Sequence, residues 1–235
     1  MELSEDAIKS LTDLGVQIQR AEKDHRDQFI SKETKDENMA RTFIDGVISS
    51  VYLKTNEPIS DITSEGEYQL MIGASFIRTH LALNDTILDG HIMESQCLLR
   101  KQVELLARLQ ELESKSVKEV AKKTPNINAI NWNAGRMYGA QSEVAHFSRF
   151  EVGEALLDRE NFESHARIGL FPKYSQNSVY AMSSRLFLGV QFSLWFTDKL
   201  AHWYPRKDFS ILQKQTLVAV EIAAANNILT KHEEG

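Results

Sequence analysis

The sequence contains few of the residues that interrupt regular structure. Its 235 residues include only four prolines and eleven glycines, whereas an all-β fold needs many turns. No long segment alternates between apolar and polar side chains, which is the pattern of a half-buried strand. These two absences argue against an all-β protein and favour long, uninterrupted helices.

Cysteine is almost absent as well. The chain has one, Cys97, so it can form no internal disulfide and no cysteine-based metal cluster. Cys97 lies in a segment rich in leucine, and free cysteine is among the most frequently buried residue types. We therefore expect Cys97 to be a buried and unreactive thiol.

The chain also lacks a strong excess of positive charge and a long apolar run. Its net charge of −6 gives no global attraction to nucleic acid. The most apolar run, residues 186–196, includes Gln191 and Ser193 and is far shorter than the about twenty residues that span a bilayer. The acidic N-terminus has no apolar signal segment. These features predict a cytoplasmic protein without a membrane span.

Apolar residues recur at helical spacing along most of the chain. We predict one all-α domain, residues 1–235, built as a bundle of about six to nine helices. It would comprise an N-terminal helical pair (1–58), central helices (64–158) and a C-terminal helical pair (177–232). In the first helix, the charge-rich stretch 21–32 is expected to project into solvent.

Two of the central helices have the most distinctive patterns. The helix over about 92–113 has an apolar arc wide enough to contact neighbours on more than one side. A later helix is expected over about 134–157, with a break near His146. An apolar helix face, rich in aromatic residues toward the C-terminus, would support a homodimer or contact a protein partner.

Polar residues on these two helices form the leading candidate site. Arg100 and Glu104 are four residues apart, and such a pair usually stabilises a helix by a few tenths of a kcal/mol. An arginine held in this way can also bind phosphate or carboxylate through two hydrogen bonds. If the helices meet, the expected binding pocket consists of Arg100, Glu104, Arg136, Tyr138, Glu143 and His146.

Glu143 and His146 are three residues apart and therefore share a helix face. Such a pair can orient an imidazole for acid–base chemistry, or the histidine can simply close a helix C-terminus. A di-metal carboxylate site would need a second Glu-x-x-His element and two further glutamates. Since the chain has only one clear element of this kind, we expect no metal and no cofactor.

A lysine run offers a second, weaker candidate. Lys115, Lys118, Lys122 and Lys123 lie close to Trp132 in the sequence and could contact a phosphate backbone, although such a run is more often a solvated helix face. No glycine-rich phosphate loop and no Gly-x-Ser-x-Gly elbow is present.

The two central segments resemble those of a group of uncharacterised bacterial all-α proteins. The shared elements are Leu-Leu-Arg-x-x-x-Glu, here residues 98–104, and Tyr-x-x-x-Ser-Glu-x-x-His, here residues 138–146. These proteins are distantly similar to HEPN helical domains, many of which are ribonucleases of toxin–antitoxin and phage-defence systems. The resemblance covers about residues 68–150 and implies a HEPN-like helical core and a role in bacterial defence.

The chain departs from the nuclease members of that family. Those members are similar in carrying an arginine followed, four to six residues later, by a histidine. Arg20 to His25 and Arg159 to His165 fit this spacing, but about one such match is expected by chance in a chain of this composition. The resemblance therefore implies a nuclease motif that is degenerate or absent.

Three functions follow as expectations, and the sequence leaves open whether the protein is an enzyme. The first is a binding or partner module of a bacterial defence or stress system that recognises a protein, a nucleotide or RNA. The second is a metal-independent ribonuclease, with His146 or His165 as general base and an arginine such as Arg159 stabilising the phosphate. The third is a structural subunit of a complex.

Overall fold

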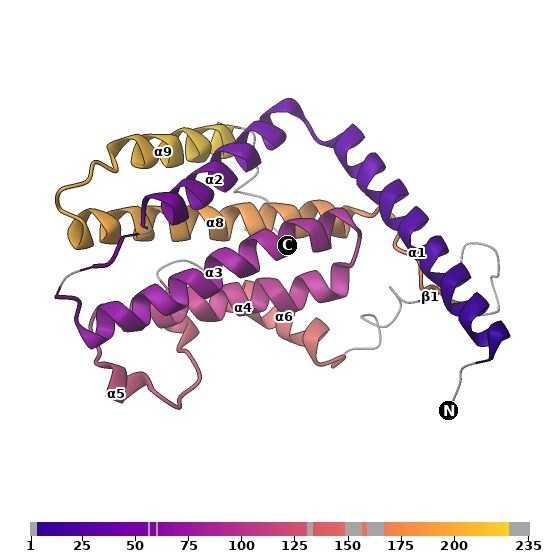
Figure 1. Ribbon diagram of the computed structural model, residues 1–235, viewed down its shortest axis with the longest axis horizontal. Coiled ribbons are helices and arrows are strands. Elements are labelled where there is room, and N and C mark those ends of the chain that lie inside the picture. The colour runs from indigo at the N-terminus through magenta and orange to yellow at the C-terminus, as the bar shows by residue number, and fades with distance from the viewer. Residues whose placement is uncertain are drawn as a thin grey trace.

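The computed structural model describes residues 4–55, 57–59, 61–130, 134–148, 157–158 and 167–225 (Figure 1). These residues confirm the predicted all-α, multi-helix bundle. The helices are α1 (Glu5–Lys32), α2 (Lys35–Lys54), α3 (Ser64–Leu88), α4 (Ile92–Glu111), α5 (Val117–Val120), α6 (Ala134–Ala145), α8 (Gln176–Trp203) and α9 (Ser210–Ala225). A 3-10 turn, η1 (Ile127–Ala129), and a short antiparallel pair, β1 (Leu157–Asp158) and β2 (Arg167–Ile168), complete the described elements.

The long helix α8 lies in the centre of the bundle (Figure 1). It packs against α2, α3, α4 and α9, while α9 also runs along α2 and α6 lies along α4. Stacked aromatic rings join α3 to α8, with Phe76 and Phe192 at 4.1 Å between ring centroids and Phe192 and Phe196 at 4.9 Å. In Figure 1, α4 and α6 lie on the side of α8 that faces away from α9.

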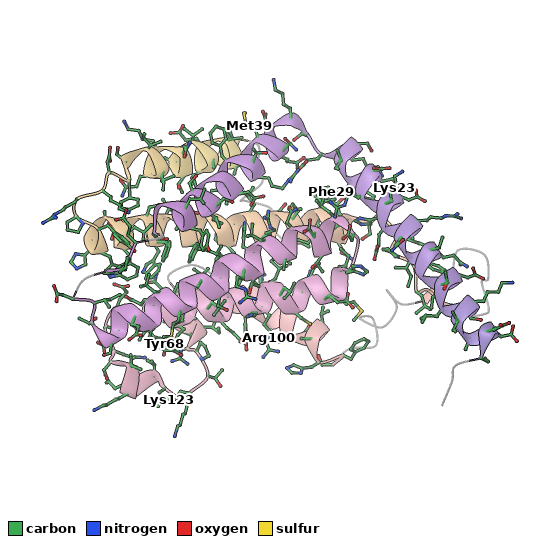
Figure 2. The ribbon with its side chains drawn as sticks, viewed as in Figure 1. Lys23, Phe29, Met39, Tyr68, Arg100 and Lys123 are labelled. Carbon is green, nitrogen blue, oxygen red and sulfur yellow. The ribbon has the colours of Figure 1, made fainter. Side chains whose placement is uncertain are left out.

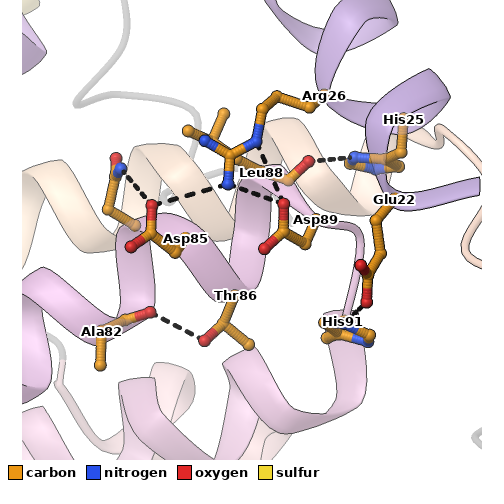
Figure 3. A network of polar contacts seen from close by, with 10 residues as sticks. Glu22, His25, Arg26, Ala82, Asp85, Thr86, Leu88, Asp89 and His91 are labelled. Carbon is orange, nitrogen blue, oxygen red and sulfur yellow. Dashed lines mark hydrogen bonds and ion pairs between the residues drawn. The ribbon is translucent and has the colours of Figure 1, made fainter. Parts of the chain in front are cut away.

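Helix α1 leaves the bundle at an angle (Figure 1) and is attached through polar contacts to the turn between α3 and α4 (Figure 3). Arg26 Nη2 lies 2.7 Å from Asp89 Oδ1 and 3.6 Å from Asp85 Oδ1. Glu22 and His91 form a second pair at 2.9 Å. The charged residues of α1 therefore bind charged residues of the turn.

His25 completes this attachment from inside the bundle. Its Nδ1 donates to the carbonyl of Leu88 at 2.8 Å, and its Nε2 accepts from the hydroxyl of Ser178 at 2.9 Å. Burial lowers the pKa of His25 despite the bond to the Leu88 carbonyl. The turn approaches so closely that a Cβ at Gly90, whose φ is +83°, would lie 2.6 Å from Pro172 and 2.7 Å from the His25 ring.

The expectation that residues 21–32 project into solvent was therefore wrong. His25 and Phe29 are buried, whereas the apolar residues of the first turns are exposed, Ile8 by 51% and Leu11 by 69%. The sequence pattern misled because the stretch uses its charges for ion pairs with α3 and the following turn. The apolar residues Ile8 and Leu11 lie in the first turns of α1, outside the part of the helix that contacts the bundle.

The burial of Cys97 and the end of the predicted helix over 134–157 also differ from the sequence-based predictions, whereas the predicted break near His146 agrees with the structure. Cys97 is exposed, because it lies about 200° around α4 from the buried Leu99 at 100° per residue. Helix α6 ends at Ala145, and Leu157 belongs to β1 rather than to a continuing helix.

A group of charged and polar side chains crosses the core. Arg185 Nη2 of α8 lies 2.6 Å from Asp45 Oδ1 of α2, and Arg185 Nε donates to the carbonyl of His80 in α3 at 3.1 Å. His80 Nε2 donates to Asp45 Oδ1 at 3.0 Å, and its Nδ1 accepts from Gln102 Nε2 of α4 at 3.3 Å. These four residues, here called the core polar network, link four helices.

The network fixes His80 in its neutral form. Burial and the nearby charge of Arg185 lower the pKa of His80 to about 4, although the contact with Asp45 opposes this shift. Burial alone would raise the pKa of Asp45, but its contacts with His80 and Arg185 lower it overall. Burial lowers the pKa of Arg185, and the Asp45 carboxylate keeps its charge compatible with the core.

We expect acid to destabilise the protein through His80. An unfolded histidine binds a proton below its ordinary pKa of 6.5, whereas folded His80 does so only near pH 4. Stability is therefore unaffected by this group above pH 6.5 and falls by about 1.4 kcal/mol per pH unit below it, or about 3 kcal/mol in total by pH 4. Urea unfolding at pH 7, 6, 5 and 4 measures this loss.

The variant His80→Gln isolates the contribution of this residue, because His25 also adds to the acid response of the wild type. The difference in stability between wild type and His80→Gln should shrink as the pH falls from 7 to 4. His202→Gln, at an exposed position, serves as the matched control and should keep the wild-type slope. Parallel curves for wild type and His80→Gln would contradict the prediction.

Candidate functional site

Arg100 is the centre of a four-residue cluster between α4 and α6. Its Nη1 lies 2.8 Å from His146 Nε2, its Nη2 donates to the Tyr138 hydroxyl at 3.0 Å, and its Nε donates to Glu104 Oε1 at 3.1 Å. Tyr138 in turn donates its hydroxyl proton to Glu104 Oε1 at 2.9 Å. All three guanidinium nitrogens are therefore engaged, and we call these residues the Arg100 cluster.

The two helices bring these side chains together because of their spacing. Arg100 and Glu104 are one helical turn apart on α4. Tyr138 and His146 are eight residues apart, slightly more than two turns, so both lie on the side of α6 that packs along α4. Figure 2 labels Arg100 on this part of the bundle.

The end of α6 positions the imidazole. His146 is the first residue after the helix, and Phe147 adopts a positive φ of 49°. The backbone N–H of Ser148 then bonds back to the carbonyl of Glu143 at 3.1 Å, while that of Phe147 bonds to Val144. This arrangement is the usual one for a helix that stops abruptly, and it leaves His146 exposed at the edge of the cluster.

The contact with Arg100 determines the role of the imidazole nitrogen. A guanidinium has only donors, so His146 Nε2 must act as the acceptor and the ring proton lies on Nδ1. Partial burial disfavours the charge of Arg100, but its contacts with Tyr138 and Glu104 raise its pKa overall. The Tyr138 ring also lies below the guanidinium, 5.0 Å from its carbon to the ring centroid.

The cluster has the donors needed to bind an oxyanion. Arg100 is held in place by Glu104 and Tyr138, and its Nη1 points toward the exposed imidazole. An anion that approaches this exposed edge would receive a charge-assisted hydrogen bond from Arg100. Among the described residues no group of three histidine, cysteine or carboxylate side chains is arranged to hold a metal ion.

The remaining candidates from the sequence lie elsewhere. Arg136 is exposed and Glu143 half-buried, both on α6 but outside the Arg100 cluster. Arg159 and His165 fall outside the residues that the structure describes. Arg20 is exposed on α1, whereas His25 is buried and bonded to Leu88 and Ser178, so this pair forms no common site.

Arg108 and Lys115 make contacts that stabilise the fold, and the rest of the lysine run is exposed. Arg108 donates to the carbonyl of Val120 at 2.9 Å and also bonds the carbonyl of Lys123, which ties the segment after α4 to the bundle. Lys115 pairs with Glu111 at 3.1 Å. Lys118, Lys122 and Lys123 are exposed, as expected for a solvated face.

Sequence reasoning missed the core polar network. The signal was available, because Asp45 follows Ile44 and precedes Val47 in an otherwise apolar helix face, and Arg185 precedes the most apolar run of the chain. Arg41 lies one turn before Asp45 on α2 and could have explained it, but Arg41 bonds to Glu33 instead. Only the packing of α2 against α8 pairs them.

Comparison with protein-family models, with curated proteins and with solved structures gave no match. Within the described residues, no helix combines the length and apolar character needed to cross a bilayer. The function of the Arg100 cluster must therefore be argued from its own geometry.

We expect Arg100 and Tyr138 to be energetically coupled. In a double-mutant cycle of Arg100→Gln and Tyr138→Phe, followed by urea unfolding, the coupling free energy should be about 0.5–1.5 kcal/mol, since one hydrogen bond to a charged, partly exposed group is removed. Tyr180→Phe, at an exposed tyrosine of α8, is the matched control and should show no coupling to Arg100→Gln. Equal values for the two tyrosines would contradict the geometry.

Proposed function

We propose that the protein is a binding module that captures a phosphate-bearing ligand, a nucleotide or the end of an RNA strand, at the Arg100 cluster. The observation that carries this proposal is the 2.8 Å contact between Arg100 Nη1 and His146 Nε2 at an exposed edge. A guanidinium, which can donate to an anion, and an imidazole are already adjacent there. Glu104 and Tyr138 orient the arginine before the ligand arrives, which lowers the entropy cost of binding.

The small amount of positive charge at the Arg100 cluster supports a ligand with few phosphate groups. The chain carries a net charge of −6, and Arg100 itself is compensated by Glu104 at 3.1 Å. A continuous basic groove would be needed to follow a duplex. The cluster instead suits one or two phosphate groups.

The resemblance of residues 68–150 to HEPN-like proteins supports a place in a bacterial defence or stress system. Under this proposal the chain is a member that has kept the helical core and binds its ligand without cleaving it. A homodimer or a protein partner would cover apolar surface such as the exposed residues of α1.

Binding can be measured with a fluorescently labelled short oligoribonucleotide and inorganic phosphate as competitor. We expect Arg100→Gln to raise the dissociation constant at least about tenfold, because a charge-assisted hydrogen bond is lost. Binding should weaken with salt as expected for about one or two phosphate contacts, that is, a slope of log K against log salt of about −0.7 to −1.4.

Arg78→Gln is the matched control, because Arg78 is an exposed arginine of α3 outside the cluster. This variant should bind the oligoribonucleotide as the wild type does. Equal losses in Arg100→Gln and Arg78→Gln would show that only general charge attracts the RNA and would overturn the proposal.

A metal-independent ribonuclease is the second candidate, and the same Arg–His contact favours it. His146 Nε2 carries no proton in this contact, so it could accept one from a ribose 2′-hydroxyl while Arg100 stabilises the phosphate. We expect this candidate to show growth arrest and RNA fragmentation in cells that express the wild type, and loss of both with His146→Ala. His165→Ala should then behave as the wild type.

The RNA test separates the three candidate functions. Cleavage by the purified protein that persists in EDTA would establish the ribonuclease. Intact RNA with phosphate-dependent binding would support the binding module. Intact RNA without such binding, together with stable co-purification of another protein, would support a structural subunit.

A further inference from the structure

A cavity of about 270 Å3 lies at the junction of α1, α2 and α8, far in sequence from the Arg100 cluster. Its apolar wall is formed by Phe29, Tyr174, Val179, Met182 and Leu186. Phe29, which Figure 2 labels where α1 meets the bundle, is buried, as are Met182 and Leu186. Ligand pockets usually have volumes from about 300 Å3 upward. This cavity is slightly smaller, so it suits a ligand with few non-hydrogen atoms.

A cation already lies against one wall of the cavity. Lys32 Nζ is 3.9 Å from the centroid of the Tyr174 ring, and the face of an aromatic ring attracts positive charge. Phe29 contacts the same ring edge-on, with centroids 6.3 Å apart and an interplanar angle of 63°. This contact holds the Tyr174 ring so that its face remains turned to the lysine.

The charges that line the cavity balance while Lys32 is in place, and they become net negative once Lys32 moves away. Arg41 Nε and Nη2 each donate to a different oxygen of Glu33 at 2.8 Å, so these two charges cancel. Glu37 instead accepts from the backbone N–H and the hydroxyl of Thr34, at 2.8 and 2.9 Å, which are neutral donors. In the described part of the chain no cation forms an ion pair with Glu37.

We propose that this cavity is a binding site for a small organic cation. The ammonium group of the ligand would lie on the face of Tyr174, within the field of Glu37. Its carbon atoms would pack on the apolar wall. Lys32 occupies the ammonium position in the free protein and leaves it when the ligand binds.

Choline and 3,3-dimethylbutan-1-ol provide a matched pair of probes, because the alcohol has carbon in place of the charged nitrogen. Met182 lines the cavity, so its ¹³C-methyl NMR signal, assigned with Met182→Leu, reports binding in the full chain. We expect choline to bind at least about fivefold more tightly than the alcohol, as a cation–π contact allows. This difference tests the charge of the ligand rather than its shape.

Three variants assign the groups that recognise the cation. Tyr174→Leu should remove the preference for choline. Glu37→Gln keeps an acceptor for the cap of α2 but removes the charge, so choline should bind several-fold more weakly and the alcohol should not change. Lys32→Gln should tighten choline binding about fivefold, because the competing ammonium is removed.

The proposal is overturned by any of three results, provided that each variant melts within about 3 °C of the wild type. The first is that the alcohol binds as tightly as choline or more tightly. The second is that choline binds Lys32→Gln more weakly than the wild type. The third is that choline causes no shift of the Met182 signal up to about 50 mM, a concentration above which binding carries little specificity. Since no variant alters the Arg100 cluster, these outcomes are independent of the proposed phosphate site.

Discussion

The packing of the bundle depends on the positive charge of Arg185, which is buried in the core. Arg185 is only 1% exposed and is the largest fully buried side chain among the described residues. Such a charge is tolerated only with a partner and with its donors satisfied, and here Asp45 and the carbonyl of His80 supply both. The core polar network therefore requires α2, α3 and α8 to meet in one register, which apolar packing alone would leave less specific.

The Arg100 cluster is built on this frame. Gln102 of α4 donates to His80 and so belongs to the network, while Arg100, two residues earlier, faces α6. One helix thus joins a buried group of charges to an exposed one. The ion pair of Arg185 is shielded from water, whereas the side chains of Arg100 and Glu104 remain 23% and 29% exposed. Water screens the second pair, which leaves it available to a ligand.

Helical periodicity predicted the fold and the Arg100 cluster because both follow from side-chain direction on one helix. Arg100 with Glu104, and Tyr138 with His146, each share a face, and only the meeting of α4 with α6 remained to be found. The periodicity could not predict the partners of Asp45, which come from helices 35 and 140 residues later in the chain. It also failed on α1, where charged residues form the attached end. The cavity beside Lys32 was missed because α1, α2 and the segment before α8 form it together.

Helix α1 has 28 residues and a length of about 42 Å, yet the contacts shown in Figure 3 lie at Glu22, His25 and Arg26. The part of the helix that precedes them is a lever arm of about 25 Å at 1.5 Å per residue. A tilt of about 10° at Glu22 would carry the tip through about 4 Å, by the same geometry. The cavity lies just beyond the pivot, on the short side of this lever, since Phe29 and Lys32 belong to the same rigid helix. A small change in the position of Lys32 is therefore amplified at the far end of α1.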